Sequence, residues 1–183
     1  MPKASNDMIL DAGLRLLLQQ GPQRFSPADV AEDLGLHRAA PTRRFGGRQG
    51  LMLAMASRQL VLTRLWLDGF ALERSPAGLR AFLAGVVAAM GEGGGFSAHL
   101  ALAAMEAEDA DMASATAERY ALMQQAIAAR VPAGLALPPD AVAGLLHAIM
   151  VGAPLQWVAL GQGRLDAFVQ ARLDQALAAL LPG

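Results

Sequence analysis

The 183-residue chain contains no cysteine, which excludes disulfides, cysteine-ligated zinc and thiol catalysis. Its three histidines have neither the His-x-x-x-His nor the His-Glu spacing of common metal sites, so we expect no metal and no cofactor. No serine stands in a Gly-x-Ser-x-Gly motif, and the glycine run at 91–95 is interpreted as a linker because no Gly-Lys-Ser/Thr follows it. We therefore predict no catalytic residues.

The sequence also lacks the strict alternation of apolar and polar residues that marks β-strands. Glycine and proline interrupt it at intervals, and the segments between them have helical spacing. We therefore predict an all-α fold of about nine helices. The apolar content of 54% is more than the interior of one subunit needs, which favours an oligomer.

The N-terminal sequence has no apolar run before Ile9, so we expect no secretory signal and predict a cytoplasmic protein. Residues 141–163 carry no acidic or basic side chain and exceed the roughly 18 apolar residues that flag a membrane helix. This segment nevertheless contains Pro154 and four glycines, and no aromatic belt or one-sided basic cluster flanks it. We expect a helix buried between its own domain and a partner subunit, and no membrane contact.

Acidic residues are missing from a second stretch, which runs from Leu34 to Leu67. Residues 1–64 have nine basic and five acidic side chains, and residues 65–183 have six and eleven, although the whole chain has a net charge of only -1. A basic N-terminal part on an acidic body is expected of a protein that binds nucleic acid. Chance clustering of solvated arginines is the alternative on charge alone. The arginines of the acid-free stretch are Arg38, Arg43, Arg44, Arg48, Arg58 and Arg64.

The basic part contains three predicted helices and the start of a fourth. The first spans about 5–20, and the second begins at Ser26, a predicted N-cap, and ends at Gly35. The third spans about 38–45, and two glycines separate it from a long helix over about 48–69. Three helices with a short glycine-containing turn match the helix-turn-helix, whose later helix enters the major groove of DNA.

The third helix has side chains suited to reading bases. Arg38, Ala39 and Thr42 lie mostly on one face of it. Arginine pairs bidentately with guanine, and an alanine or threonine methyl group contacts thymine. The N–H groups at the starts of the second and fourth helices can hold phosphates, with help from Ser26 and Arg48.

The segment from Ile9 to Leu51 has a recognisable order of motifs. Asp29-Val30-Ala31 lies in the second helix, and then come Gly35-Leu36-His37, Ala39-Ala40, Thr42, Arg44-Phe45 and Arg48. This order resembles the N-terminal domain of the tetracycline-repressor (TetR) family of bacterial transcription regulators. The chain departs from the family pattern where His37 replaces a capping serine, Thr42 a phosphate-contacting tyrosine and Arg44 a histidine. Pro41 lies about one turn into the third helix.

Arg43 and Arg44 can reach phosphate and offset the missing tyrosine. The predicted DNA-binding residues are thus Ser26, His37, Arg38, Ala39, Thr42, Arg43, Arg44 and Arg48.

The composition changes from arginine-rich to apolar near residues 50–55, within the fourth helix, which predicts a helix-turn-helix domain over residues 1–52 and a second domain over residues 53–183. The resemblance implies that this second domain is all-helical. This second domain is expected to dimerise through the last two helices and to hold a small apolar effector. Nine methionines supply adaptable apolar lining for such a cavity. Core or dimer-interface packing is the alternative for each candidate. The predicted ligand-binding residues are Trp66, Phe70, Met90, His99, Met105, Met123, His147, Met150 and Trp157.

Together these features predict a homodimeric, ligand-responsive transcriptional repressor that binds a palindromic operator in double-stranded DNA. A helical ligand-binding dimer that has lost specific DNA binding remains an alternative, because His37, Pro41 and Thr42 are unusual for the family. A helical enzyme is a third class, supported only by the expected apolar pocket.

Overall fold

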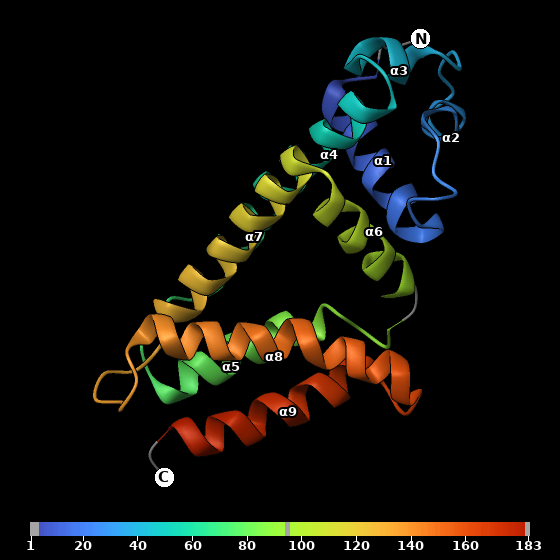
Figure 1. Cartoon of the computed structure of the whole chain (residues 1–183). Coiled ribbons are helices and arrows are strands. Elements are labelled where there is room, and N and C mark those ends of the chain that lie inside the picture. Colours follow the sequence, from blue (N-terminus) through green and yellow to red (C-terminus); the bar gives the residue numbers. More distant parts are fainter. Residues whose placement is uncertain (1–3, 94–95, 182–183) are drawn as a thin grey trace. The chain divides into compact units, whose positions relative to one another are not determined.

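A computed structural model describes residues 4–93 and 96–181, and within these ranges it contains helices and no strand (Figure 1). The predicted all-α class and the predicted number of helices are confirmed for this part of the chain. Two residues of the predicted glycine linker, Gly94 and Gly95, lie outside the described residues. The nine helices are α1 (Asn6–Gln20), α2 (Pro27–Asp33), α3 (Ala40–Phe45), α4 (Arg48–Asp68), α5 (Pro76–Ala88), α6 (Phe96–Glu108), α7 (Ala110–Ala128), α8 (Pro139–Leu160) and α9 (Leu165–Leu180).

Local sequence signals set the bounds of the short helices. The Ser26 hydroxyl accepts a hydrogen bond from the backbone N–H of Asp29, and the Asp29 carboxylate accepts one from the backbone N–H of Ser26. This reciprocal capping box begins α2 where the sequence predicts it. The third helix begins at Ala40, two residues later than expected. Pro41 explains the difference, because a residue without a backbone N–H fits only the first turn of a helix.

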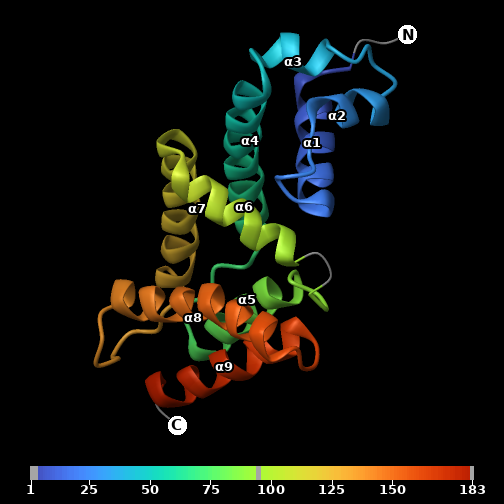
Figure 2. The same ribbon diagram turned by 45° about the vertical axis from the view of Figure 1, so that its right-hand side comes forward.

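The helices form two compact units, and α4 and α7 each contribute to both. Unit 1 consists of Met1–Leu65 and Gly95–Arg119. Figure 2 shows α1, α2 and α3 grouped at the N-terminal end of α4. The core of this unit also includes side chains of α6 and α7, namely Leu102 and Met112. The N-terminal helices therefore share one core with α6, and the predicted division at residue 52 stays a prediction.

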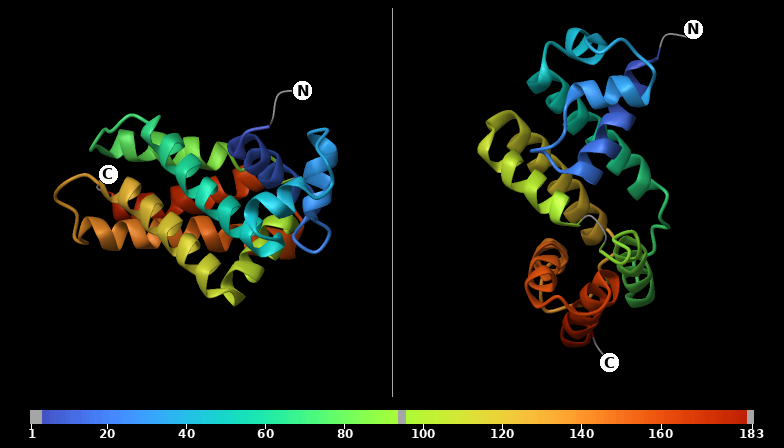
Figure 3. Two further views of the ribbon diagram at one scale, coloured as in Figure 1. Left: turned by 90° about the horizontal axis from the view of Figure 1, so that it is seen from above. Right: turned by 90° about the vertical axis from the view of Figure 1, so that its right-hand side faces the viewer.

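Unit 2 consists of Trp66–Gly94 and Tyr120–Gly183. Its closest helix pair is α8 with α9, and α5 packs on α9 (Figure 3). On one side of α8 the side chains are buried, Leu146 among them. On the other side, Leu145, Leu155 and other apolar residues are exposed. By length and composition α8 is the one helix among residues 4–93 and 96–181 that could cross a membrane. Its buried side makes it a core helix of unit 2.

Candidate DNA-binding and effector sites

The turn between α2 and α3 is fixed by backbone geometry. Gly35 has a φ of 62°, a left-handed conformation that glycine adopts without strain. The N–H of Leu36 donates to the carbonyl of Ala31 over 2.8 Å, which closes the C-terminal end of α2. Past the turn, the His37 ring nitrogen Nδ1 accepts a hydrogen bond from the N–H of Ala39 over 3.2 Å. His37 thus provides the side-chain acceptor that a serine supplies in the family pattern.

The α3 helix has one exposed polar face and one buried face. Pro41 is buried, and Thr42 and Arg43 are exposed. Arg38, which the sequence placed on this helix, is exposed in the turn before it, because the helix begins only at Ala40. Ala39, at the start of this helix, is half-buried. The predicted base-reading face is therefore accessible, although the helix has only six residues.

Two further arginines that the sequence predicts to contact phosphate join segments of the head, which is the N-terminal part of unit 1 formed by α1, α2 and α3. The half-buried Arg44 donates from Nη1 to the carbonyl of Ala4 over 2.6 Å. The exposed Arg48 donates from Nη2 to the carbonyl of Pro22 over 2.8 Å. A carbonyl does not neutralise a guanidinium. Within the described part of the chain, neither arginine has an acidic partner, so both keep their positive charge at the surface of unit 1.

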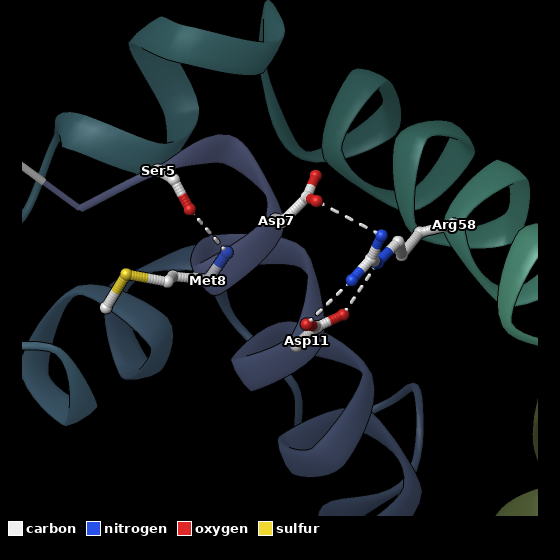
Figure 4. A network of polar contacts seen from close by, with 5 residues as sticks. All are labelled: Ser5, Asp7, Met8, Asp11 and Arg58. Carbon is white, nitrogen blue, oxygen red and sulfur yellow. Dashed lines mark hydrogen bonds and ion pairs between the residues drawn. The ribbon is translucent and has the colours of Figure 1, made fainter.

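Arg58 differs from the other arginines of the acid-free stretch, because two carboxylates neutralise it. Its Nε and Nη2 donate to Asp11 over 2.8 and 3.0 Å, and its Nη1 donates to Asp7 over 3.2 Å (Figure 4). These hydrogen bonds lower the pKa of Asp11 below its usual range. Arg58 therefore joins α4 to α1. The spacing of Asp7 and Asp11 by one helical turn was the sequence signal for this contact.

Ser26 and Arg38 lie together at a hollow of about 430 Å³ on the surface of the helix-turn-helix. Two carboxylates, those of Asp29 and Glu32, also line this hollow. Glu32 was not among the residues that the sequence predicts for the site. A carboxylate at this position repels phosphate and can accept a hydrogen bond from the amino group of cytosine.

The predicted effector residues divide between the two units. Trp66 and Phe70 come together at the end of α4, with ring centroids 5.1 Å apart and nearly perpendicular rings. Phe82 of α5 continues this row, at 5.2 Å from Phe70. The guanidinium of Arg130 lies over Phe82 at 4.2 Å. Phe82 and Arg130 were missed from the sequence, because only the fold brings them to this row.

Other predicted effector residues of unit 2 have structural contacts. His147 is buried on α8, where Gln124 and the edge-on ring of Tyr120 contact it from α7. Burial lowers the pKa of His147, so its ring is neutral at pH 7. Trp157 donates from Nε1 to the carbonyl of Gly163 over 3.1 Å and closes the turn after α8. Of the methionines in this unit, Met150 is buried, and Met90 and Met123 are half-buried.

Two predicted effector residues belong to unit 1. His99 stacks on Phe96 with ring centroids 5.9 Å apart. Met105 packs against the core of unit 1 and lines a pocket of about 340 Å³ together with Arg48. Among the described residues no group of three or more His, Asp or Glu side chains is placed to hold a metal ion.

Comparison with known proteins agrees with this geometry. The family model described as bacterial regulatory proteins, tetR family, matches residues 9–55. No curated protein matches the chain. Among solved structures, a TetR transcription regulator from Haloarcula marismortui is similar, with a TM-score of 0.81, 16% identity and coverage of 96% of this chain and 97% of that chain.

Two other similar structures bear on ligands. The multidrug binding protein EbrR, solved in complex with proflavin, has a TM-score of 0.66 and 20% identity, with coverage of 92% of this chain and 97% of that chain. The flavonoid-responsive regulator FrrA has a TM-score of 0.56 and 20% identity, with coverage of 96% of both chains. These similarities extend the shared fold to the C-terminal helices. Residues 9–55 therefore match the N-terminal domain of the tetR family of bacterial regulatory proteins, and the rest of the chain shares the fold of the solved structures.

Proposed function

We propose that the chain is a cytoplasmic, homodimeric transcriptional repressor that binds a palindromic operator and releases it when a small apolar effector binds unit 2. The observation that carries this proposal is the exposed face of α3. Thr42 and Arg43 are exposed there and Arg38 is exposed in the turn before the helix, and no carboxylate among the described residues forms an ion pair with either arginine. Such a face suits both base edges and phosphates.

The exposed side of α8 supports a homodimer. Leu145, Val151, Leu155 and Val158 are 37–51% exposed there. Gly144 and Gly152 lie on the same side, and nothing lies within 4 Å of the position of an added Cβ, so a second helix can approach closely. Two copies of this side, related by a two-fold axis, would form a self-complementary interface. A dimer also presents two α3 helices to successive major grooves, roughly 34–36 Å apart.

The row of aromatic rings supports a planar aromatic effector. Trp66 is 39% exposed and forms one end of the row Trp66–Phe70–Phe82. A flat apolar molecule gains both area burial and ring contacts against such a row. EbrR was solved with proflavin and FrrA is flavonoid-responsive, and both ligand types are planar and aromatic.

Selection of bound duplexes from a random library tests DNA reading when the operator sequence is unknown. A repressor of this kind enriches a palindrome and retards it as a dimer. Enrichment of no sequence would favour the alternative, a ligand-binding helical dimer that has lost specific DNA binding. Titration of proflavin into the free protein then tests the effector site, because proflavin intercalates into the duplex itself and loss of the complex would not show binding to unit 2. No binding to the free protein would exclude this class of effector.

Salt dependence distinguishes the arginines that contact phosphate. Arg43→Ala should flatten the slope of log K against log salt by about one phosphate contact. Arg15→Ala is the matched control. Arg15 lies in the same unit and is exposed, but its charge is paired with Asp33 at 2.6 Å. Equal slopes for the two variants would remove Arg43 from the interface.

A further inference from the structure

One of the five acidic side chains of the head has no structural partner. The other four pair with an arginine or cap a helix: Asp7 and Asp11 with Arg58, Asp33 with Arg15, and Asp29 with the backbone N–H of Ser26. The fifth, Glu32, is exposed, and its carboxylate has no hydrogen bond or ion pair with any described residue. It lies in the last turn of α2, where the helix dipole disfavours a negative charge. Neither contacts nor helix geometry therefore give Glu32 a role in stabilising the head.

Glu32 lines the same hollow of the helix-turn-helix as Arg38, the arginine that the sequence predicts to read a base. Both side chains are exposed, and they form no ion pair with each other. Two further polar side chains on the hollow, those of Ser26 and Asp29, are used by the capping box of α2. The acceptors of Glu32 and the donors of Arg38 are thus the groups of this hollow that a bound molecule can use.

The backbone between Glu32 and Arg38 is held by hydrogen bonds in the turn. The carbonyl of Glu32 accepts the N–H of Gly35 over 3.1 Å, and the carbonyl of Ala31 accepts the N–H of Leu36 over 2.8 Å. The two side chains therefore start from fixed positions. Groups that are positioned before binding lose less conformational freedom when they bind, so each can be matched to a particular base edge.

The two side chains have opposite hydrogen-bonding properties. An ionised carboxylate only accepts hydrogen bonds, and a guanidinium only donates them. In the major groove of DNA, guanine presents the acceptors N7 and O6, whereas cytosine presents its N4 amino group as a donor. Adenine also has an amino group there, but its N7 acceptor lies beside that group and repels a carboxylate. A carboxylate next to a guanidinium therefore matches a cytosine next to a guanine.

We propose that Glu32 selects a cytosine in each half of the operator, beside the guanine that Arg38 binds. This inference rests on the function proposed above and specifies which bases the head prefers. The carboxylate also repels the phosphates of every duplex, so Glu32 lowers the affinity for DNA of any sequence while it raises discrimination at one position. A residue with only a structural role would not produce two effects of opposite sign.

Glu32→Ala removes the carboxylate and leaves a residue of high helix propensity in α2. Glu118→Ala is the matched control, because Glu118 is an exposed glutamate on α7 in the same unit. Circular dichroism checks that both variants are folded. Fluorescence anisotropy with a duplex of random sequence at low salt then measures affinity without base reading. Glu32→Ala should bind this duplex about threefold more tightly than the unmodified chain, and the control should bind it with unchanged affinity.

The duplex selected from the random library measures discrimination. In one half-site the cytosine is replaced by pyrimidin-2-one, a base that lacks the amino group and still pairs with guanine. The unmodified chain and Glu118→Ala should each bind the altered duplex about tenfold less tightly than the selected one. For Glu32→Ala the loss should be less than twofold. Arg38→Ala should bind both duplexes more weakly and keep the loss of about tenfold, because Glu32 contacts the cytosine itself.

Four results would overturn the role of Glu32 and leave the proposed function standing. These are an enriched palindrome without cytosine in its half-sites, equal losses for Glu32→Ala and the unmodified chain, an unchanged affinity of Glu32→Ala for the random duplex, and disappearance of the loss in Arg38→Ala. The last result would show that Glu32 acts only by orienting Arg38. Enrichment of no sequence at all would refute the proposed function, and base selection by Glu32 with it.

Discussion

Replacement of Leu155 by glutamate should turn the proposed dimer into monomers. Leu155 is 51% exposed on the apolar side of α8, beside Val151 and Val158. Full burial of a leucine or valine side chain contributes about 1.5–3 kcal/mol, so the burial of the remaining half contributes about 1 kcal/mol. Four such residues on each of two subunits then contribute about 8 kcal/mol of favourable burial to the interface.

The glutamate acts twice in a two-fold interface, because each subunit contributes one. An unpaired carboxylate in such an interface costs about 3 kcal/mol or more. Two of them therefore weaken the dimer by about 6 kcal/mol, or roughly four orders of magnitude in dissociation constant. A dimer with a nanomolar dissociation constant would become largely monomeric at micromolar concentration.

Sedimentation equilibrium at micromolar concentration measures this change directly. Leu72→Glu is the control, because Leu72 is 71% exposed outside α8 and belongs to the same unit. The control should remain dimeric, and the melting curve of each variant shows whether the subunit is folded. If Leu155→Glu leaves the dissociation constant unchanged, α8 does not form the dimer interface.

Three other substitutions test separate parts of the structure. Arg44→Ala should weaken binding to every duplex and flatten the salt slope by about one charge, as measured by fluorescence anisotropy; an unchanged slope would leave Arg44 only as the support of Ala4. Gly50→Ala should lower the melting temperature and abolish duplex binding, because the added methyl group would overlap the backbone carbonyl of Phe45 and force α3 to shift; wild-type affinity would contradict this. Burial lowers the pKa of His147 in the folded protein. As the pH falls below about 6.5, the His147 ring is therefore protonated in the unfolded chain before it is protonated in the folded one, and the free energy of unfolding decreases. Between about pH 7.5 and 5.5, the His147→Gln variant should therefore lose less free energy of unfolding than the unmodified chain, as measured by urea unfolding. Equal losses would refute the lowered pKa of His147.

Much of the fold follows from local sequence signals. Ser26 and Asp29 form the capping box that their spacing predicts, and Gly35 takes the left-handed conformation that ends α2. The number of helices and the all-α fold class are predictable because such signals act over a few residues. The sequence prediction placed the start of α3 two residues too early, at Arg38. The helix begins at Ala40 because Pro41 lacks a backbone N–H and fits only the first turn of a helix.

The site was less predictable, because its contacts join distant segments. Arg58 was grouped with the basic face, but it pairs with carboxylates 47 and 51 residues away. Trp157 was assigned to a ligand pocket, and in the structure its indole N–H closes a turn. The Glu106–Arg119 ion pair was not predicted. Glu106 lies in an acidic cluster, and the sequence alone does not distinguish an exposed glutamate in such a cluster from a buried one that pairs with an arginine. Such pairings depend on helix packing, which composition does not encode.

The shared core of α1 and α6 limits how this chain can be rebuilt. A fragment that stops at Leu65 would leave bare the side of α1 on which α6 packs, including the neighbourhood of Leu102. Grafting the head onto another body would require transfer of α6 as well, although some thirty residues separate the two segments. Exchange of operator preference between such regulators is therefore better attempted by changing the surface of α3 than by swapping whole N-terminal cassettes.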